Sequence, residues 1–401
     1  MRLPKYFTAF IALCLVSLFA DITYEGCRSV LGAYFEVLGA TAVIAGSISA
    51  GEFLSYIVRG VSGFIAGTLR SSLTYWLLIF AGYALNLVAV PLLALAGNWP
   101  LALTLVMAER VGKGLRTPAR DVVLAEVTEG MGRGKGFGLH ELMDQIGAVS
   151  GPAIVMLALK FTNNYSFTYA ILALPALAAL AALTVAYRSY PSVKAVEPGQ
   201  HRTGGLGPYF CLFTASVALL SLGYIHWGVA AYHMRTSSII PDYMVAVMYL
   251  VAMLTDAAVA YPAGYLYDRI GPKTILATPV LAAVTTPALL LARSSWNFII
   301  ASAIWGVVMG IYETNMRVVV ADVVPPSRRA HAYGIYGLVF GGSWTLGNIV
   351  IGYLYTVSVN YAVAYVAVTE VVALAVVLLF TLKFRGPGPL NKSQSTDSVT
   401  S

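Results

Sequence analysis

Charged residues are scarce in this chain. Asp, Glu, Lys and Arg make up 11% of its 401 residues, while hydrophobic residues make up 58%. Soluble domains carry about 25% charged residues, so this chain lacks the polar surface needed to stay in water. Inside a bilayer every backbone polar group needs a partner, and a helix supplies its own. We therefore expect an all-α membrane protein that contacts the lipid bilayer.

Cysteine is equally rare, and its positions exclude two kinds of chemistry. Cys14, Cys27 and Cys211 all fall inside apolar runs, without Cys-x-x-Cys or Cys/His spacing. We expect buried thiols, with neither a disulfide nor a thiolate metal site.

Common enzyme signatures are missing too. The sequence has no Gly-x-x-x-x-Gly-Lys-Ser/Thr loop for ATP, no His-Glu-x-x-His motif and no Ser or Cys nucleophile elbow. We therefore expect no enzyme and no cofactor, with a proton or other ion gradient as the driving force.

The apolar runs are long enough for twelve membrane-spanning helices of about 20 residues each. Their expected ranges are 7–35, 42–66, 74–96, 100–121, 136–159, 167–187, 208–232, 242–266, 274–292, 298–320, 332–355 and 362–383. An even number of crossings puts both termini on one side of the membrane.

A repeat divides the chain into two halves. Ala125-Glu126-Val127 with Gly138 reappears as Ala321-Asp322-Val323 with Gly334, an offset of 196 residues. Such a repeat predicts two pseudo-symmetric six-helix bundles, a common plan for a secondary transporter. The expected divisions are an N-terminal bundle at 1–187, a polar cytoplasmic linker at 188–207, a C-terminal bundle at 208–385 and a disordered cytoplasmic tail at 386–401.

Loop charges indicate the orientation. Seventeen Lys and Arg residues, Arg116 and Arg120 among them, fall on the side of the termini, against Lys160, Arg235 and Arg293 on the other. Basic loops stay in the cytoplasm, so we expect both termini to be cytoplasmic in the plasma membrane. The net charge of +7 is thus explained without nucleic acid, and we expect a monomer.

Three loop and helix patterns resemble those of the major facilitator superfamily. They are Gly264-Tyr-Leu-Tyr-Asp268-Arg269-Ile-Gly271-Pro-Lys273, Arg110-Val-Gly-Lys-Gly114 and Gly147-Ala-Val-Ser-Gly151-Pro152, the last similar to the segment associated with antiporters. The resemblance covers residues 5–385. It implies twelve helices, alternating access and transport of a small molecule, and Asp21–Arg28 with Gly112–Asp121 is similar to a prokaryotic branch of undefined substrate.

The sequence departs from the family's pattern in the first half. Gly67 stands where the resemblance implies an Asp in the equivalent loop. A gate latch on the cytoplasmic face would then rest on Asp268 alone.

Ionisable residues within the spans are candidate functional groups because each is costly in lipid. Asp21, Glu25 and Arg28 share one helical face, and Arg28 can neutralise Glu25 at i+3. Burial favours the uncharged form of a carboxyl group, so Asp21 is our proton-carrier candidate, with Glu25 also in the proton-coupling set. The alternative is a closed ion network that only positions the first span.

The fifth span carries a second cluster, His140, Glu141 and Asp144. A His beside a carboxylate can relay protons, and Asp144 is the next proton-carrier candidate. An equally good interpretation is that His140 lies at the solvated start of the helix and has no functional role.

Further residues predict the wall of a substrate cavity. Arg110 could clamp a carboxylate, whereas Arg317 is expected to pair with Glu313 at i−4. Aromatic or partly polar wall residues are Tyr24, Tyr224, His226 and Trp227, which suit flat or cationic molecules; ordinary packing is the alternative. Asp256 and Glu370 stand alone.

These features predict proton-coupled export of a small organic or amphipathic compound. Uptake of an organic anion through Arg28, Arg110 and Arg317 is an alternative, as is divalent metal export through Asp21, Glu25, His140 and Asp144. A receptor that has kept the fold but lost transport is a third, disfavoured by the short loops.

Overall fold

A computed structural model describes residues 4–129, 133–193, 206–325 and 328–384, and these residues form helices without any strand. In chain order the helices are α1 (Lys5–Val37), α2 (Ala42–Ser47), α3 (Ala50–Leu69), α4 (Ser72–Leu92), α5 (Trp99–Val127), α6 (Arg133–Thr162), α7 (Tyr165–Ile171), α8 (Ala173–Ser189), α9 (Pro208–Gly223), α10 (Trp227–Ser237), α11 (Asp242–Ile270), α12 (Ala277–Leu290), α13 (Ser295–Val323), α14 (Arg329–Val357) and α15 (Val359–Lys383), with the short 3₁₀ segments η1 (Leu93–Leu95) and η3 (Gly271–Leu276).

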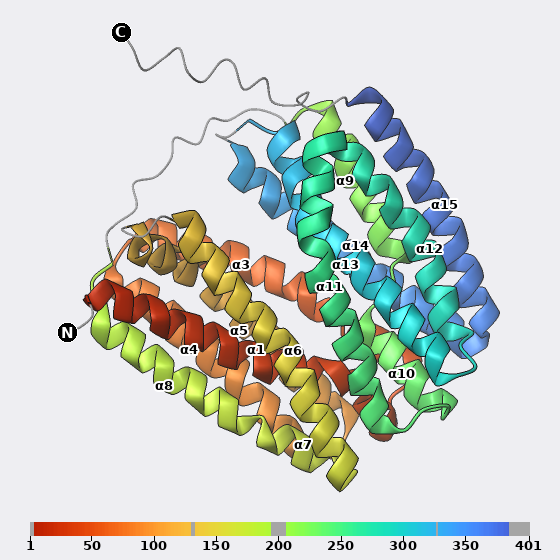
Figure 1. The fold of residues 1–401 in the computed structure, drawn as a ribbon, viewed down its shortest axis with the longest axis horizontal. Coiled ribbons are helices and arrows are strands. Elements are labelled where there is room, and N and C mark those ends of the chain that lie inside the picture. The colour runs from red at the N-terminus through yellow and green to blue at the C-terminus, as the bar shows by residue number, and fades with distance from the viewer. Residues whose placement is uncertain (1–3, 130–132, 194–205, 326–327, 385–401) are drawn as a thin grey trace.

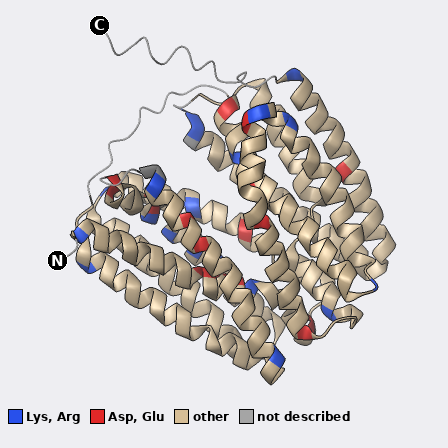
Figure 2. Ribbon diagram, in the orientation of Figure 1, with Lys and Arg blue, Asp and Glu red and all other residues tan. Residues whose placement is uncertain are grey.

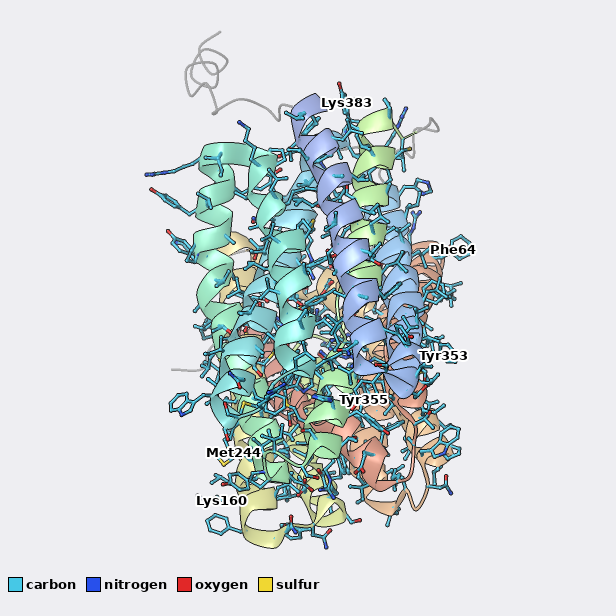
Figure 3. The ribbon with its side chains drawn as sticks, turned by 90° about the vertical axis from the view of Figure 1, so that its right-hand side faces the viewer. Phe64, Lys160, Met244, Tyr353, Tyr355 and Lys383 are labelled. Carbon is cyan, nitrogen blue, oxygen red and sulfur yellow. The ribbon has the colours of Figure 1, made fainter. Side chains whose placement is uncertain are left out.

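The helices are consistent with the twelve expected crossings. Within the described ranges, nine helical stretches are long and apolar enough to span a membrane, and one of them, Asp242–Leu290, joins α11 and α12 through η3. The charged helices α3 and α5 fall outside that group because length and apolar composition alone define it. Lys383 and Lys160 lie at opposite ends of the molecule (Figure 3).

The helices form two groups that diverge toward the ends carrying the termini (Figure 1). In the first half α1 packs against α6 and α8, and α4 packs against α5; in the second, α11 packs against α13, and α9 against α14 and α15. Across the halves α1 contacts α10, α6 contacts α11, and α14 contacts α2 and α3. The ribbons of α8 and α15 carry few charged residues (Figure 2).

Glycines let the two halves touch where they meet. A Cβ on Gly32 of α1 would lie 1.9 Å from the Gly228 carbonyl oxygen of α10, and one on Gly46 would lie 2.2 Å from the Asn348 carbonyl oxygen. Only small residues allow backbones to approach so closely. Away from the termini, the halves are therefore in direct backbone contact.

The seventh expected span is interrupted, which corrects the continuous helix predicted at 208–232. Residues Tyr224 to His226 separate α9 from α10. Their carbonyl groups keep partners: Trp344 Nε1 donates to Tyr224 O at 2.8 Å, and Trp305 Nε1 donates to Ile225 O at 2.9 Å. Side chains of other helices thus replace the missing helical bonds.

Two further expectations need correction. Arg116 and Arg120, counted above among the loop charges, lie inside α5, which runs past the expected end at 121 to Val127. Cys14 and Cys27 are buried as expected, but Cys211, near the start of α9, is exposed. Most of the expected linker and the whole tail, 386–401, lie outside the described residues.

Candidate functional site

A chain of ion pairs crosses the middle of the first half, and we call it the central ion network. On α1, Arg28 Nη1 lies 2.9 Å from Glu25 Oε1, which confirms the predicted i, i+3 pair. Glu52 of α3 lies between two guanidinium groups, 3.4 Å from Arg28 and 3.1 Å from Arg110. Arg110 of α5 also pairs with its neighbour Glu109 at 3.0 Å.

The network reaches two further helices, one of them in the other half. Asn86 of α4 donates to Glu109 Oε1 at 2.7 Å. Tyr249 of α11 donates its hydroxyl to Glu25 Oε2 at 2.6 Å. The network therefore links four helices of the first half to one helix of the second.

This arrangement limits what Arg110 can do. Its side chain is 3% exposed and lies between the carboxylates of Glu52 and Glu109. Removing one partner of a buried pair is strongly destabilising. We conclude that Arg110 holds α3 and α5 together in this conformation rather than offering a free clamp to a carboxylate.

Asp21 lies in a different setting from Glu25. Its carboxyl group is buried on α1, where a Cβ on Gly147 of α6 would come within 2.7 Å of the Asp21 Cβ. Within the described part of the chain it has no ion-pair partner closer than 4 Å. Asp144 of α6 and Glu25 of α1 are the acids that repel its charge.

The cluster on α6 is only partly what the sequence suggested. His140 Nδ1 lies 3.6 Å from Asp144 Oδ2, but the His140 ring is buried rather than solvated. Glu141 is exposed. Gly147 and Gly151 pack α6 onto α1, since a Cβ on Gly151 would come within 2.5 Å of the Ile22 carbonyl oxygen. Pro152 lies within the same helix.

Three of the four expected wall residues are buried where the second half meets the first, and Trp227 Nε1 donates to Ser29 O of α1 at 3.0 Å. Tyr224, His226 and Trp227 are buried around the break between α9 and α10. Tyr224 stacks between the rings of Trp305 and Trp344. These side chains therefore stabilise the break in this conformation. The fourth, Tyr24, lies on α1 in the first half.

Four charged residues of α11 and α13 are exposed in this conformation. Glu313 and Arg317 are both exposed and lie further than 4 Å apart, so the expected ion pair is absent from this conformation. Asp268 and Arg269 are also exposed, and Arg269 stacks on Tyr265 at 4.5 Å. Gly264 lies in α11, and Gly271, with φ of 66°, ends it.

Two basic residues that the sequence analysis did not single out complete the site. Lys113 and Arg116 follow Arg110 on α5 at steps of three residues, the only local signal that they share a face. The Lys113 ammonium lies 4.6 Å from the centre of the Tyr24 ring, and the Arg116 guanidinium lies 4.1 Å from that of Tyr83.

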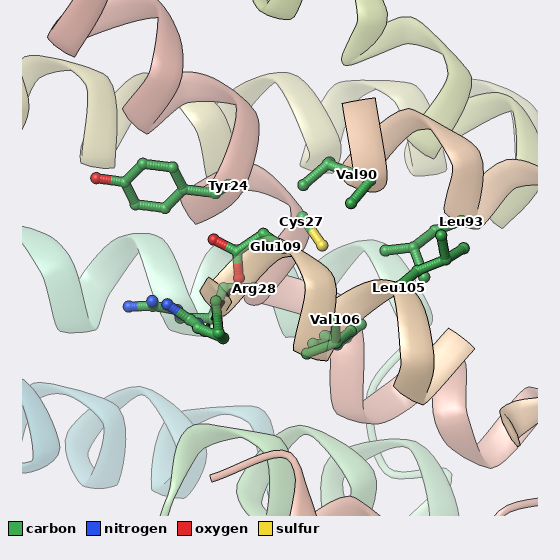
Figure 4. A pocket seen from close by; sticks show the side chains of 11 residues that line it. Tyr24, Cys27, Arg28, Val90, Leu93, Leu105, Val106 and Glu109 are labelled. Carbon is green, nitrogen blue, oxygen red and sulfur yellow. Dashed lines mark ion pairs between the residues drawn. The ribbon is translucent and has the colours of Figure 1, made fainter. Parts of the chain in front are cut away.

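A small pocket adjoins this region (Figure 4). Tyr24, Arg28 and Glu109 line one end, and the other end is apolar with Val90, Leu93 and other residues. Its volume of about 10 Å³ leaves room for about one water molecule. Among the described residues, no three His, Cys, Asp or Glu side chains converge as metal ligands.

The fold and the charged interface between two helical halves define a membrane transporter. The model of the Major Facilitator Superfamily matches residues 210–400. An uncharacterized protein of Mycobacterium tuberculosis is 36% identical, over 93% of this chain and 92% of its own length. An uncharacterized MFS-type transporter of Methanocaldococcus jannaschii is 25% identical, over 85% of this chain and 87% of its own. The chain belongs to the major facilitator superfamily.

Solved structures share the fold across nearly the whole chain. The nucleoside transporter NupG superposes with a TM-score of 0.72 at 14% identity, covering 94% of this chain and 99% of its own. A bacterial homolog of the human lysosomal transporter Spinster, in an inward-facing and occupied conformation, gives 0.75 at 14% identity, covering 96% and 98%. The chain is thus a secondary transporter by fold and family.

Proposed function

We propose that this chain moves a small organic compound across the plasma membrane by proton-coupled alternating access, with Asp21 as the proton carrier. The observation that carries the proposal is the contrast between two acids one turn apart on α1. Glu25 is bound by Arg28 and Tyr249, whereas Asp21 is buried without an ion-pair partner among the described residues. Burial of a carboxyl group without a direct ion-pair partner favours its protonated form.

The position of Asp21 suits a carrier. It lies on α1, the helix that contacts α6 and α8 in its own half and α10 and α11 in the other. A change in how the halves meet would alter the surroundings of this helix, and with them the proton affinity of Asp21. Asp144, across the α1–α6 contact, is the second candidate.

Export of an organic compound keeps some support, whereas export of a divalent metal has little. The prediction of export relied partly on an aromatic wall, and three of its residues are buried in this conformation, so export stays a prediction from the Gly147–Pro152 segment. For metal export, no group of three or more His, Cys, Asp or Glu side chains that could hold a metal ion occurs in the described part of the chain.

The orientation is part of the proposal. Basic loops on the side of the termini support cytoplasmic termini, and in that orientation the diverging ends of Figure 1 open to the cytoplasm. Lys273 and Arg293 flank the single helix α12. In a variant lacking Cys14, Cys27 and Cys211, Lys273→Cys should react with reagent from the cytoplasm and Arg293→Cys from outside. Reaction of both from the same side would reject the topology.

Transport into vesicles tests the proton carrier. A stability screen of purified protein against organic cations, carboxylates and divalent metals would first supply a ligand, since a ligand that binds the folded state raises the melting temperature. In proteoliposomes a pH gradient should drive accumulation of that ligand by the wild type but not by Asp21→Asn. Asp256→Asn, a buried acid of the other half, is the matched control. Uphill transport by Asp21→Asn would reject Asp21 and leave Asp144 as the candidate.

A further inference from the structure

Three basic side chains surround one aromatic ring in the first half. Arg28, Lys113 and Arg116 lie 6.0, 4.6 and 6.0 Å from the centre of the Tyr24 ring. Arg28 is neutralised by Glu25 and Glu52. Lys113 and Arg116, by contrast, have no carboxylate within 4 Å in the part of the chain that the structure describes.

The positive charges of Lys113 and Arg116 are poorly neutralised for side chains that are buried or partly buried. Arg116 is 2% exposed, and its Nε atom has no hydrogen-bond partner in the structure. Lys113 lies one turn before it on the same face of α5 and is partly buried. Contact with an aromatic ring offsets only part of the cost of burying a cation, about 0.5–2 kcal/mol. Two neighbouring cations repel each other, so the arrangement favours an anion between them.

We propose that Lys113 and Arg116 bind the carboxylate of a small organic anion, with Tyr24 beside it. This rests on the proposed transport function and names its substrate class. The guanidinium fork of Arg116 matches a carboxylate, and the ammonium of Lys113 supplies a second, compact charge. Unlike Arg28 and Arg110, neither side chain must leave a carboxylate of the protein to do so.

The two cations act on the proton carrier electrostatically. Asp21 is repelled by Asp144 and Glu25 and attracted by Lys113 and Arg116. Asp144 in turn faces Arg120, Arg116, Lys113, Ser17 and His140. When Asp21 is ionised it compensates the two cations and competes with a bound carboxylate. When it is protonated, both cations are available to the ligand.

Proton and anion therefore strengthen each other's binding, as linkage requires of two coupled sites. A carrier loaded with both moves them in the same direction. The site thus favours cotransport of a proton with an organic anion over exchange of one for the other. Where the outside is more acidic than the cytoplasm, protons flow inward, and cotransport then gives uptake of the anion rather than its export.

The test is binding of acetate, lactate, succinate, citrate and benzoate to the purified full-length protein. Binding is measured as an increase in the melting temperature of the protein at pH values between 6 and 8. At least one should stabilise the wild type. Lys113→Gln and Arg116→Gln should weaken its binding about tenfold or more. Lys160→Gln, which removes a lysine near the Tyr243 ring at the end of the molecule opposite Lys383 (Figure 3), should bind as the wild type does. Lys113→Arg should retain binding, which separates lost charge from lost folding.

The pH dependence separates this inference from the proton-carrier proposal. Affinity should rise as the pH falls in the wild type and be high and nearly constant in Asp21→Asn. Equal pH dependence in both, with binding still lost in Lys113→Gln, would keep the anion site and reject Asp21 as its partner. Binding of none of the five carboxylates, or unchanged binding in both Gln variants, would overturn the anion site.

Discussion

The hydroxyl of Tyr249 on α11 donates a hydrogen bond to Glu25 on α1, with the two oxygens 2.6 Å apart. This bond joins the second half to the central ion network of the first. Because a charged acceptor strengthens a hydrogen bond to about 1.5–3 kcal/mol, it contributes to holding the halves together in this conformation.

Tyr249→Phe should therefore shift the protein toward the alternative conformation, in which the ends away from the termini separate. The bond energy allows a change of about tenfold or more in the ratio of the two states. Distance spectroscopy with one label in each half measures the ratio. Tyr243→Phe on the same helix is the control, and identical distance distributions for Tyr249→Phe and the wild type would contradict the role.

Gly32→Ala should act in the same direction for a steric reason. The added Cβ would lie 1.9 Å from the Gly228 carbonyl oxygen, so α1 and α10 could no longer touch. Gly60→Ala on α3 is the matched control because its Cβ would meet nothing within 4 Å. The same spectroscopy should show longer distances in Gly32→Ala only; an unchanged distribution would mean that α1 and α10 are not in contact in the membrane.

Glu52→Gln should lower stability because Glu52 alone bridges Arg28 and Arg110. Loss of the shared carboxylate leaves two largely buried cations under-compensated, at a cost of about 3 kcal/mol. Glu36→Gln removes a half-exposed partner of Arg235 and should cost less than about 1 kcal/mol. Melting temperatures in detergent compare the two variants, and an equal loss for both would show that the network adds no special stability.

Asp268→Asn concerns the other face of the transporter. Asp268 is exposed in this conformation, where the ends near the termini diverge, so any latch that it forms must act in the opposite state. Gly67, its counterpart in the first half, carries no acid. The substitution should enrich the conformation seen here and impair transport. If Asp268→Asn has the same conformational populations and the same transport rate as the wild type, Asp268 does not form a latch.

The spacing of residues along a single helix predicted part of the site. It could not predict contacts between residues on different helices. The Glu25–Arg28 pair follows from helix geometry, and the structure confirms it. The partners of Glu52 lie on two other helices, and no spacing along α3 indicates them. Lys113 and Arg116 were visible as basic residues, but only packing shows that they lie beside Tyr24.

The twelve apolar runs predicted the helices well because a helix in lipid needs length and apolar composition. The break at Tyr224 to His226 was missed because no proline marks it. Its stability comes from Trp305 and Trp344, which lie on α13 and α14, about 80 and 120 residues later in the chain. Such tertiary hydrogen bonds leave no local signal.

Proton exchange on ligand binding tests the central claim most directly. In weakly buffered solution near neutral pH, the wild type should take up protons as its ligand binds, because binding raises the proton affinity of Asp21 by linkage. Asp21→Asn should bind the same ligand with no proton uptake, while Asp256→Asn should take up protons as the wild type does. Equal uptake by Asp21→Asn and the wild type would contradict the claim that Asp21 carries the proton.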